Sequence, residues 1–134
     1  MNVDALNHFF TTQFQGLEPL PRVESATPDE TVVRLPFHPR WLRPGNTLSG
    51  PAMMTLSDTV AYAALLARDE AAAGSVTSNL NIHFLRRPSP VDLIGKGKVL
   101  KTGRRLSIVN VELFTDDNLV AYATVTYAMP SRSG

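Results

Sequence analysis

The segment "SGPAMMTLSDTVAYAALLA", residues 49–67, constrains the fold more than any other part of the chain. Its apolar residues recur at helical spacing on two adjoining stripes, and a helix that is apolar nearly all round is buried in a domain. Pro51 suits the first turn of a helix, where its missing N–H is not needed, and Ser49 or Gly50 can cap that turn. The sequence therefore predicts a long buried helix over about residues 50–68.

Beyond this helix the pattern changes to the alternation of apolar and polar residues that β-strands show. Four such segments lie between residues 75 and 129, and short turn-like connections separate them. Consecutive strands are therefore expected to pair antiparallel, as a meander. In the first strand, Val76 is expected to share a face with Leu80 and Ile82, while Thr77 lies on the opposite face.

The chain before the buried helix contains a helical pattern over about residues 4–15 and two strand-like segments, "LPRVESAT" and "ETVVRLPF". Gly95 and Gly97 remove side chains from one face of a later strand, which permits another backbone to come close. This order of elements favours an α+β domain in which a curved antiparallel sheet wraps around one long helix.

The composition bounds the class of protein. With 134 residues the chain suits one domain, over residues 1–134, with a substantial core. Only 19% of the residues are charged, against ~25% in typical soluble domains, which favours a surface partly covered by another copy of the chain. The net charge of +1 gives no reason to expect nucleic acid or a membrane surface as partner. No cysteine, secretory signal or membrane span is visible, so disulfides and thiolate chemistry are excluded and a cytoplasmic location is expected.

One carboxylate, Asp58, stands in the middle of the apolar helix. Burial of an unpaired charge is costly, so stability gives little reason to keep it there. Pro51, Thr55 and Tyr62 fall on the same face as Asp58 and form with it a narrow polar stripe. Two interpretations are open. Either the stripe faces water or is satisfied by internal hydrogen bonds, or Asp58 lines a cleft and activates water as a general base.

Gly50 is a second candidate, because a free N–H at the start of a helix can receive an oxygen that gains negative charge. Alternatively, this glycine only permits a tight turn. The histidines are far apart in sequence and show no metal-ligand spacing, so no metal site is predicted. Two pairs of basic residues lie near turns, Arg86 with Arg87 and Arg104 with Arg105. They are either solvated surface or ligands for the phosphates of a substrate.

The order of these features resembles a known family. The layout "RPGNTLSGPAMMTLSDTVAYAALL", "SVTSNLNIHFLRRP" and "DLIGKGKVLKTGRRLSIVNVELFTDDNLVAYATVTYAM" is similar to that of hotdog-fold acyl-CoA thioesterases of the phenylacetic-acid-degradation (PaaI) type. The resemblance covers about residues 30–129. It implies the hotdog fold, an acyl-CoA thioester as small-molecule substrate and no cofactor beyond the coenzyme A of that substrate. It also implies a homodimer or homotetramer with sites at the subunit interface.

The resemblance also assigns roles to particular residues. Carried over by position, Asp58 is the catalytic acid, and the Gly50 N–H polarises the thioester carbonyl. A hydroxyl residue that some members use corresponds to Thr77. Those members also use an asparagine whose position is occupied here by Arg43, and Asn46 lies close by in the sequence.

Two positions depart from the family pattern His-Gly-Gly. Ser49 stands in place of the histidine and Pro51 in place of the second glycine. Ser49 joins the candidate catalytic residues as a hydrogen-bonding group, but a hydroxyl cannot act as a base near neutral pH. The expected function is hydrolysis of acyl-CoA thioesters, with the acyl group held by Met53, Met54 and neighbouring helix residues. A non-catalytic acyl-CoA-binding or assembly module on the same fold is the alternative, and a hotdog dehydratase fits less well because no histidine lies near the helix start.

Overall fold

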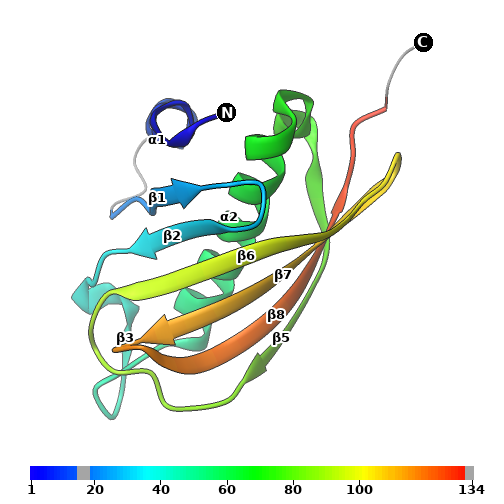
Figure 1. The fold of residues 1–134 in the computed structure, drawn as a ribbon. Coiled ribbons are helices and arrows are strands. Elements are labelled where there is room, and N and C mark those ends of the chain that lie inside the picture. The colour runs from blue at the N-terminus through cyan, green and yellow to red at the C-terminus, as the bar shows by residue number, and fades with distance from the viewer. Residues whose placement is uncertain (15–18, 132–134) are drawn as a thin grey trace.

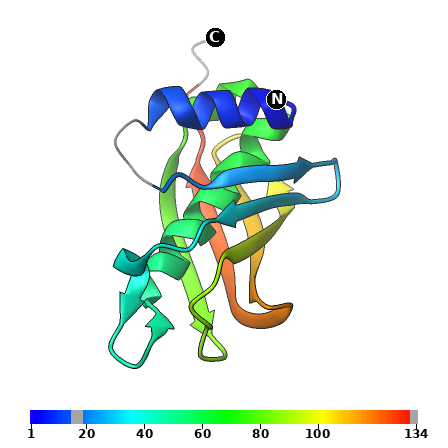
Figure 2. The same ribbon diagram turned by 90° about the vertical axis from the view of Figure 1, so that its left-hand side faces the viewer.

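The computed structural model describes residues 1–14 and 19–131. A curved sheet of six strands wraps around helix α2 (Gly50–Arg68), and helix α1 (Val3–Gln13) lies across one end of the domain (Figures 1 and 2). The predicted α+β architecture, a curved antiparallel sheet around one long helix, is confirmed, and it is the hotdog fold that the resemblance implied.

Helix α2 begins and ends where the sequence predicts. Ser49 is its N-cap, and the Ser49 Oγ accepts a hydrogen bond from the Ala52 N–H at 3.2 Å. Pro51 occupies the first turn, where no N–H is needed. After Arg68 the chain leaves the helix at Asp69 and forms a short 3-10 turn, η2 (Glu70–Gly74).

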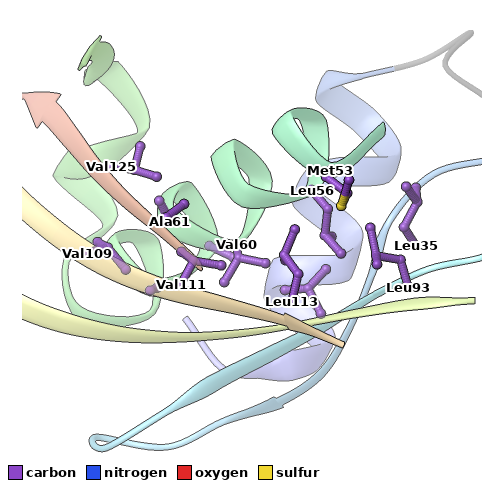
Figure 3. Packing of buried hydrophobic residues seen from close by; sticks show 14 of the residues in the cluster. Leu35, Met53, Leu56, Val60, Ala61, Leu93, Val109, Val111, Leu113 and Val125 are labelled. Atoms are coloured by element: carbon purple, nitrogen blue, oxygen red, sulfur yellow. The ribbon is translucent and has the colours of Figure 1, made fainter. Parts of the chain in front are cut away.

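The core lies between α2 and the concave face of the sheet, where Val60 points toward the side chains of β7 (Figure 3). The two glycines of strand β6 (Leu93–Thr102) make the close approach possible. A Cβ atom on Gly95 would lie 2.5 Å from Cγ2 of Val60, and one on Gly97 would lie 2.6 Å from Cγ1 of the same residue. The predicted close contact at these glycines is therefore confirmed.

The sheet places its strands in the order β1-β2-β6-β7-β8-β5, with every neighbouring pair antiparallel. Besides β6, the strands are β1 (Arg22–Ala26), β2 (Thr31–Leu35), β5 (Val76–Phe84), β7 (Leu106–Thr115) and β8 (Asn118–Ala128). The predicted meander over residues 75–129 is wrong at its first strand, because β5 pairs with β8 at the far edge and not with β6.

The connection between β5 and β6 explains this difference. It runs from residue 85 to residue 92 and is held by other elements along its length. The backbone N–H of Leu85 donates to Val120 O at 2.8 Å, and Pro88 O accepts from the Thr47 Oγ1 at 2.8 Å. A segment anchored in this way crosses the ends of β7 and β8 instead of forming a tight hairpin.

The remaining elements lie before α2. Helix α1 is anchored to β1 by Asn7, whose side chain both donates to Val23 O and accepts from Val23 N. The last residue of the predicted helix, 15, lies outside the described residues. The two predicted strands correspond to β1 and β2, which pair with each other. The loop that follows contains η1 (Pro39–Trp41) and a hairpin of β3 (Leu42–Arg43) and β4 (Thr47–Leu48). No helix in the described ranges is long and apolar enough to cross a membrane.

Candidate active site

Asp58 is half-buried in the middle of α2, and two hydroxyl groups hold its carboxylate. The Thr77 Oγ1 and the Tyr127 Oη each donate a hydrogen bond to Asp58 Oδ1, both at 2.7 Å. These bonds supply the polar partners that a carboxylate needs when it is withdrawn from water. The helix keeps its charge because two neighbouring strands offer hydrogen-bond donors to it.

A β-bulge in β5 brings Thr77 to this position. The register of the β5–β8 pair shifts between Thr77 and Asn79, so that Thr77 lies opposite Tyr127 while Leu80 lies opposite Val125. Residues directly opposite each other in an antiparallel pair share a face, so Thr77 points toward the helix. The prediction that Val76 shares a face with Leu80 and Ile82 while Thr77 lies on the opposite face is therefore wrong, because the bulge puts Thr77 on the face of Leu80.

Tyr127 is buried, with 4% of its surface exposed, and its ring stacks on the ring of Tyr62 with centroids 5.8 Å apart. The Tyr62 hydroxyl donates in turn to Ala73 O at 2.7 Å. Burial, together with the neighbouring Asp58 carboxylate, raises the pKa of the Tyr127 phenol above its usual range. Near neutral pH the Tyr127 phenol therefore keeps its proton and can donate a hydrogen bond.

Asp58 lines a pocket of about 580 Å³ together with Thr55, Thr59 and Tyr62 from the same helix. The polar stripe predicted on α2 thus faces this pocket at three of its four residues. The other walls come from the end of α1, from the segment before β1, from the last residue of β2, from η1, and from β5 and β8. They are formed by Phe10, Phe14, Pro19, Leu20, Pro21, Leu35, Arg40, Trp41, Ser75, Val76, Thr77 and Tyr127. Most of this lining is apolar, and Asp58 is the carboxylate in it. Asp58 is thus internally hydrogen-bonded and also lines a cleft, and its predicted role as a general base stays a prediction.

The N-terminus of α2 leaves one backbone donor open. The Ser49 Oγ accepts a hydrogen bond from the Ala52 N–H, and the Ser49 carbonyl oxygen accepts one from the Met53 N–H. Pro51 has no N–H. Within the described part of the chain, no hydrogen-bond acceptor faces the N–H of Gly50. A free N–H at a helix start, where the helix dipole is positive, can bind an oxygen that carries negative charge.

Gly50 does not line the pocket of Asp58. Asp58 follows Gly50 by eight residues in one helix, so the two lie about 12 Å apart along its axis at about 1.5 Å per residue. The neighbours of Gly50 are instead Phe84 and Met54, which a Cβ atom on Gly50 would meet at 3.6 Å and 3.9 Å. Neither Met54 nor the buried Met53 lines the pocket of Asp58.

Several predicted binding residues gather at the Gly50 end of the helix. Arg43 and Asn46 are exposed on the β3–β4 hairpin, and the Arg87 Nη1 donates to Gly45 O in the same hairpin at 3.4 Å. Arg86, also exposed, precedes Arg87 in the connection after β5.

Arg104 and Arg105 lie elsewhere, in the turn between β6 and β7. Arg104 lines a separate cavity of about 1020 Å³ at the C-terminal end of α2, together with Arg68. Of the four predicted arginines, Arg104 lines this cavity, and none of the four lines the pocket of Asp58. Among the described residues, no three His, Asp or Glu side chains lie close enough together to hold a metal ion.

Comparison with known proteins places this geometry in a family. The family model described as "Thioesterase superfamily" matches residues 45–122, more than half of the chain. The chain belongs to the thioesterase superfamily. Among solved structures, this superfamily member is similar to a protein of Silicibacter sp. TM1040 assigned as a thioesterase, at 34% identity and a TM-score of 0.88, over 98% of this chain and 93% of that one.

Two further structures share the fold of this superfamily member at lower identity. Zebra fish thioesterase superfamily member 2 is 22% identical, with 97% of this chain and 99% of that chain covered and a TM-score of 0.83. A mutant of the phenylacetic acid degradation protein PaaI from Thermus thermophilus is 21% identical, with 82% and 93% covered and a TM-score of 0.72. The predicted hotdog-type thioesterase family is confirmed. A comparison with curated protein sequences gave no match.

The part of this thioesterase superfamily member that matches the family model contains Gly50, Asp58 and Thr77, but the match ends before Tyr127. The aromatic wall from α1 also lies outside it. Sequence reasoning missed these residues. No local pattern marks Tyr127, because its role depends on β5 lying beside β8, and the phenylalanines of α1 have the spacing of ordinary core residues.

Proposed function

We propose that this protein hydrolyses acyl-CoA thioesters, with Asp58 as the general base. The observation that carries the proposal is the placement of the Asp58 carboxylate, which two hydroxyls hold at one end of a largely apolar pocket. Such a pocket excludes bulk water from an acyl group while one charged oxygen acceptor remains within reach of the carbonyl. Membership of the thioesterase superfamily supports thioester hydrolysis as the reaction.

In this mechanism the Asp58 carboxylate takes a proton from a water molecule as the water oxygen adds to the thioester carbonyl carbon. The carbonyl oxygen becomes negatively charged, and a Gly50 N–H donates a hydrogen bond to it. The carbon–sulfur bond then breaks, and the thiolate of coenzyme A takes up the proton that Asp58 held. The products are a carboxylic acid and a thiol. Direct attack of the carboxylate on the carbonyl carbon is the alternative that the same residues allow.

In this proposal the two groups come from different copies of the chain, which the separation of about 12 Å between Gly50 and Asp58 along α2 supports. Strand β5 offers the surface for a second copy. It is an edge strand that pairs only with β8 among the described strands, and its ends carry Val76 and Phe84, which are 63% and 50% exposed. Leu85 and Met54, also exposed, extend this apolar area. An uncovered apolar edge strand is a surface on which another strand can pair.

A two-fold axis near Leu80, the middle of β5, would pair this strand antiparallel with β5 of a second copy. Val76 of one copy would then lie opposite Phe84 of the other. Asp58 contacts the Val76 end of β5 through Thr77, and Gly50 contacts the Phe84 end. The axis therefore brings Asp58 of one copy toward Gly50 of the other and creates two equivalent sites in a homodimer.

The acyl group would occupy the pocket of Asp58 against the aromatic side chains of Phe10, Phe14 and Trp41. The phosphates of coenzyme A would bind Arg86 and Arg87, which lie at the Gly50 end and thus beside the second copy's Asp58. Guanidinium groups suit this task because they donate paired hydrogen bonds to phosphate oxygens.

A panel of aliphatic and aromatic acyl-CoA substrates, with release of free thiol as the readout, tests the proposal. The unaltered protein is expected to release thiol, and Asp58→Asn is expected to lower kcat at least ~100-fold, the scale of a lost general base. Asn has the shape of Asp, so the melting temperature serves as the control for folding. Equal activity of the variant would overturn the mechanism. Binding of acyl-CoA without thiol release would support the non-catalytic module that the departures at Ser49 and Pro51 left open.

A further inference from the structure

We propose that Tyr127 is a positioning residue of the site: with Thr77 it fixes Oδ1 of Asp58, so that Oδ2 is the oxygen that acts on the thioester. This inference rests on the proposed function and adds to it a residue and an atom. Tyr127 lies outside the stretch that the family model matches, and the inference depends only on contacts within this chain.

The hydrogen bonds to Asp58 divide its two carboxylate oxygens. The Thr77 Oγ1 and the Tyr127 Oη both lie 2.7 Å from Oδ1. The Tyr127 Oη also lies 3.1 Å from the Asp58 carbonyl oxygen, but a phenol has one proton and the carboxylate is the closer acceptor. No described residue donates a hydrogen bond to Oδ2. Since Asp58 lines the pocket, Oδ2 is the oxygen left to accept a proton from water.

Tyr127 is the more rigid of the two donors. Its side chain is 4% exposed and stacks on Tyr62, with the two rings inclined by 12°. Tyr62 is itself fixed by its hydrogen bond to Ala73 O and by edge contacts with Phe10 of α1 and with Phe14, which directly follows that helix. Thr77, in contrast, is an exposed residue at the start of an edge strand. A buried donor that cannot change its rotamer sets the rotation of the carboxylate more firmly than an exposed one.

The β5–β8 register makes the arrangement specific. Thr77 and Tyr127 are cross-strand partners, and both reach one oxygen because the bulge after Thr77 turns its side chain to the inner face. If the phenol proton is removed, one donor remains and the carboxylate gains rotational freedom. The geometry of proton transfer is then less often correct, which lowers the rate of the chemical step more than it affects substrate binding.

Steady-state kinetics on Tyr127→Phe test the inference, because phenylalanine keeps the ring stack and removes only the hydroxyl. The expected result is a loss in kcat of about 10- to 100-fold, with KM changed less than about twofold, which is the range for one hydrogen bond to a charged group. Tyr122→Phe is the matched control. It makes the same change on the same strand, but Tyr122 lies opposite His83, four residues beyond the bulge, and not beside Asp58. Tyr62→Phe is a second control. It removes the hydrogen bond from the Tyr62 hydroxyl to Ala73 O, which helps to hold the ring that stacks on Tyr127, and it leaves the Tyr127 hydroxyl in place.

A second measurement does not depend on activity. A buried phenol bonded to a carboxylate should give a slowly exchanging hydroxyl proton in the NMR spectrum, downfield of an ordinary phenol. This resonance is expected to vanish in Tyr127→Phe, to persist in Tyr122→Phe and to move upfield in Asp58→Asn. A resonance that does not move in Asp58→Asn would overturn the inference.

The outcomes separate the two proposals. If the unaltered protein hydrolyses thioesters and Tyr127→Phe retains the kcat of Tyr122→Phe, the positioning role is overturned and the proposed function stands. A lower melting temperature with unchanged kcat would show that Tyr127 only supports the fold, and this too overturns the inference. If the unaltered protein hydrolyses no thioester of the panel, the proposed function fails and the positioning role fails with it.

Discussion

The two ends of strand β5 differ in whether the polar groups beside them find hydrogen-bond partners within the chain. At the Thr77 end, Asp58 receives two hydrogen bonds, Tyr127 is buried, and aromatic rings from α1 close the pocket. At the Phe84 end, the Gly50 N–H lacks a partner among the described residues, and Phe84, Leu85 and Met54 leave apolar surface exposed. The carboxylate at the Thr77 end finds its hydrogen-bond donors within a single chain, whereas the Gly50 N–H at the Phe84 end finds no acceptor among the described residues.

The difference teaches which half of the proposed site one chain can build. A carboxylate needs internal donors in order to be withdrawn from water, so its partners are supplied by the same domain. An oxyanion donor must stay unpaired until the substrate arrives, because a satisfied N–H has nothing to give. The Phe84 end therefore suits a surface that a second copy covers, and each prediction below tests one side of this contrast.

Removal of the open donor should have the largest effect. Gly50→Pro deletes the N–H, and Ser49 already has the extended backbone, φ −78° and ψ 157°, that a residue before proline requires. We expect kcat to fall about 10²- to 10³-fold, the range for one lost oxyanion donor. Gly50→Ala is the matched control, since it keeps the N–H and its Cβ would make ordinary contacts at 3.6 Å or more. Similar losses in both variants would show that Gly50 serves shape and not hydrogen bonding.

Mixed dimers test whether the two ends meet across copies. A dimer of one Asp58→Asn chain and one Gly50→Pro chain, purified with two different tags, contains one site with both groups intact if the site joins two copies. Its kcat should then be about half that of the unaltered dimer, although the kcat of each parent variant is lowered about 100-fold or more. If both groups acted within one chain, every site of the mixed dimer would lack one of them. No recovery of activity would thus contradict the shared site.

The two pairs of arginines test which end of α2 binds the phosphates of coenzyme A. Arg86 and Arg87 lie at the Gly50 end, whereas Arg104 lines a cavity around Arg68, at the far end of α2. Joint replacement of Arg86 and Arg87 by alanine should raise KM for acyl-CoA about tenfold with little change in kcat, since the lost contacts are made equally in the ground and transition states. The same change at Arg104 and Arg105 serves as the control and should leave KM within about twofold. A larger effect at Arg104 and Arg105 would place the phosphates at the other end.

Much of the fold could be predicted from local pattern. The limits of α2 follow from a capping Ser49, from Pro51 in the first turn and from an apolar surface nearly all round. The glycines of β6 indicated the close contact that Val60 makes. The strand order could not be predicted, because the anchors of the β5–β6 connection lie on strands far away in sequence.

The candidate site divides in the same way. Asp58 and Gly50 stand out because each contradicts its local surroundings, a charge in an apolar helix and a glycine at a helix start. Tyr127 is not unusual in its local sequence, since aromatic residues are common in strands. The inward turn of Thr77 needs a bulge that no residue type in the sequence announces. Long-range pairing decides both, and a single sequence does not display it.

The smallest expected effect concerns the burial of the Tyr127 phenol beside Asp58. Burial raises the pKa of Tyr127, and also that of Tyr62, above the ordinary value of 10.0. Above about pH 10 the unfolded chain releases these phenol protons while the folded chain keeps them, so the folded state binds more protons and its stability falls as pH rises. Below that pH both states are protonated and this contribution is fully present. For Tyr127 alone the slope of the unfolding free energy approaches about 1.4 kcal/mol per pH unit.

Urea unfolding between pH 9 and about pH 11 measures this slope. Tyr127→Phe should lose stability less steeply than Tyr122→Phe, because it lacks the proton that only the folded chain retains. Parallel curves for the two variants would contradict the prediction, because they would mean that the fold does not raise the pKa of Tyr127.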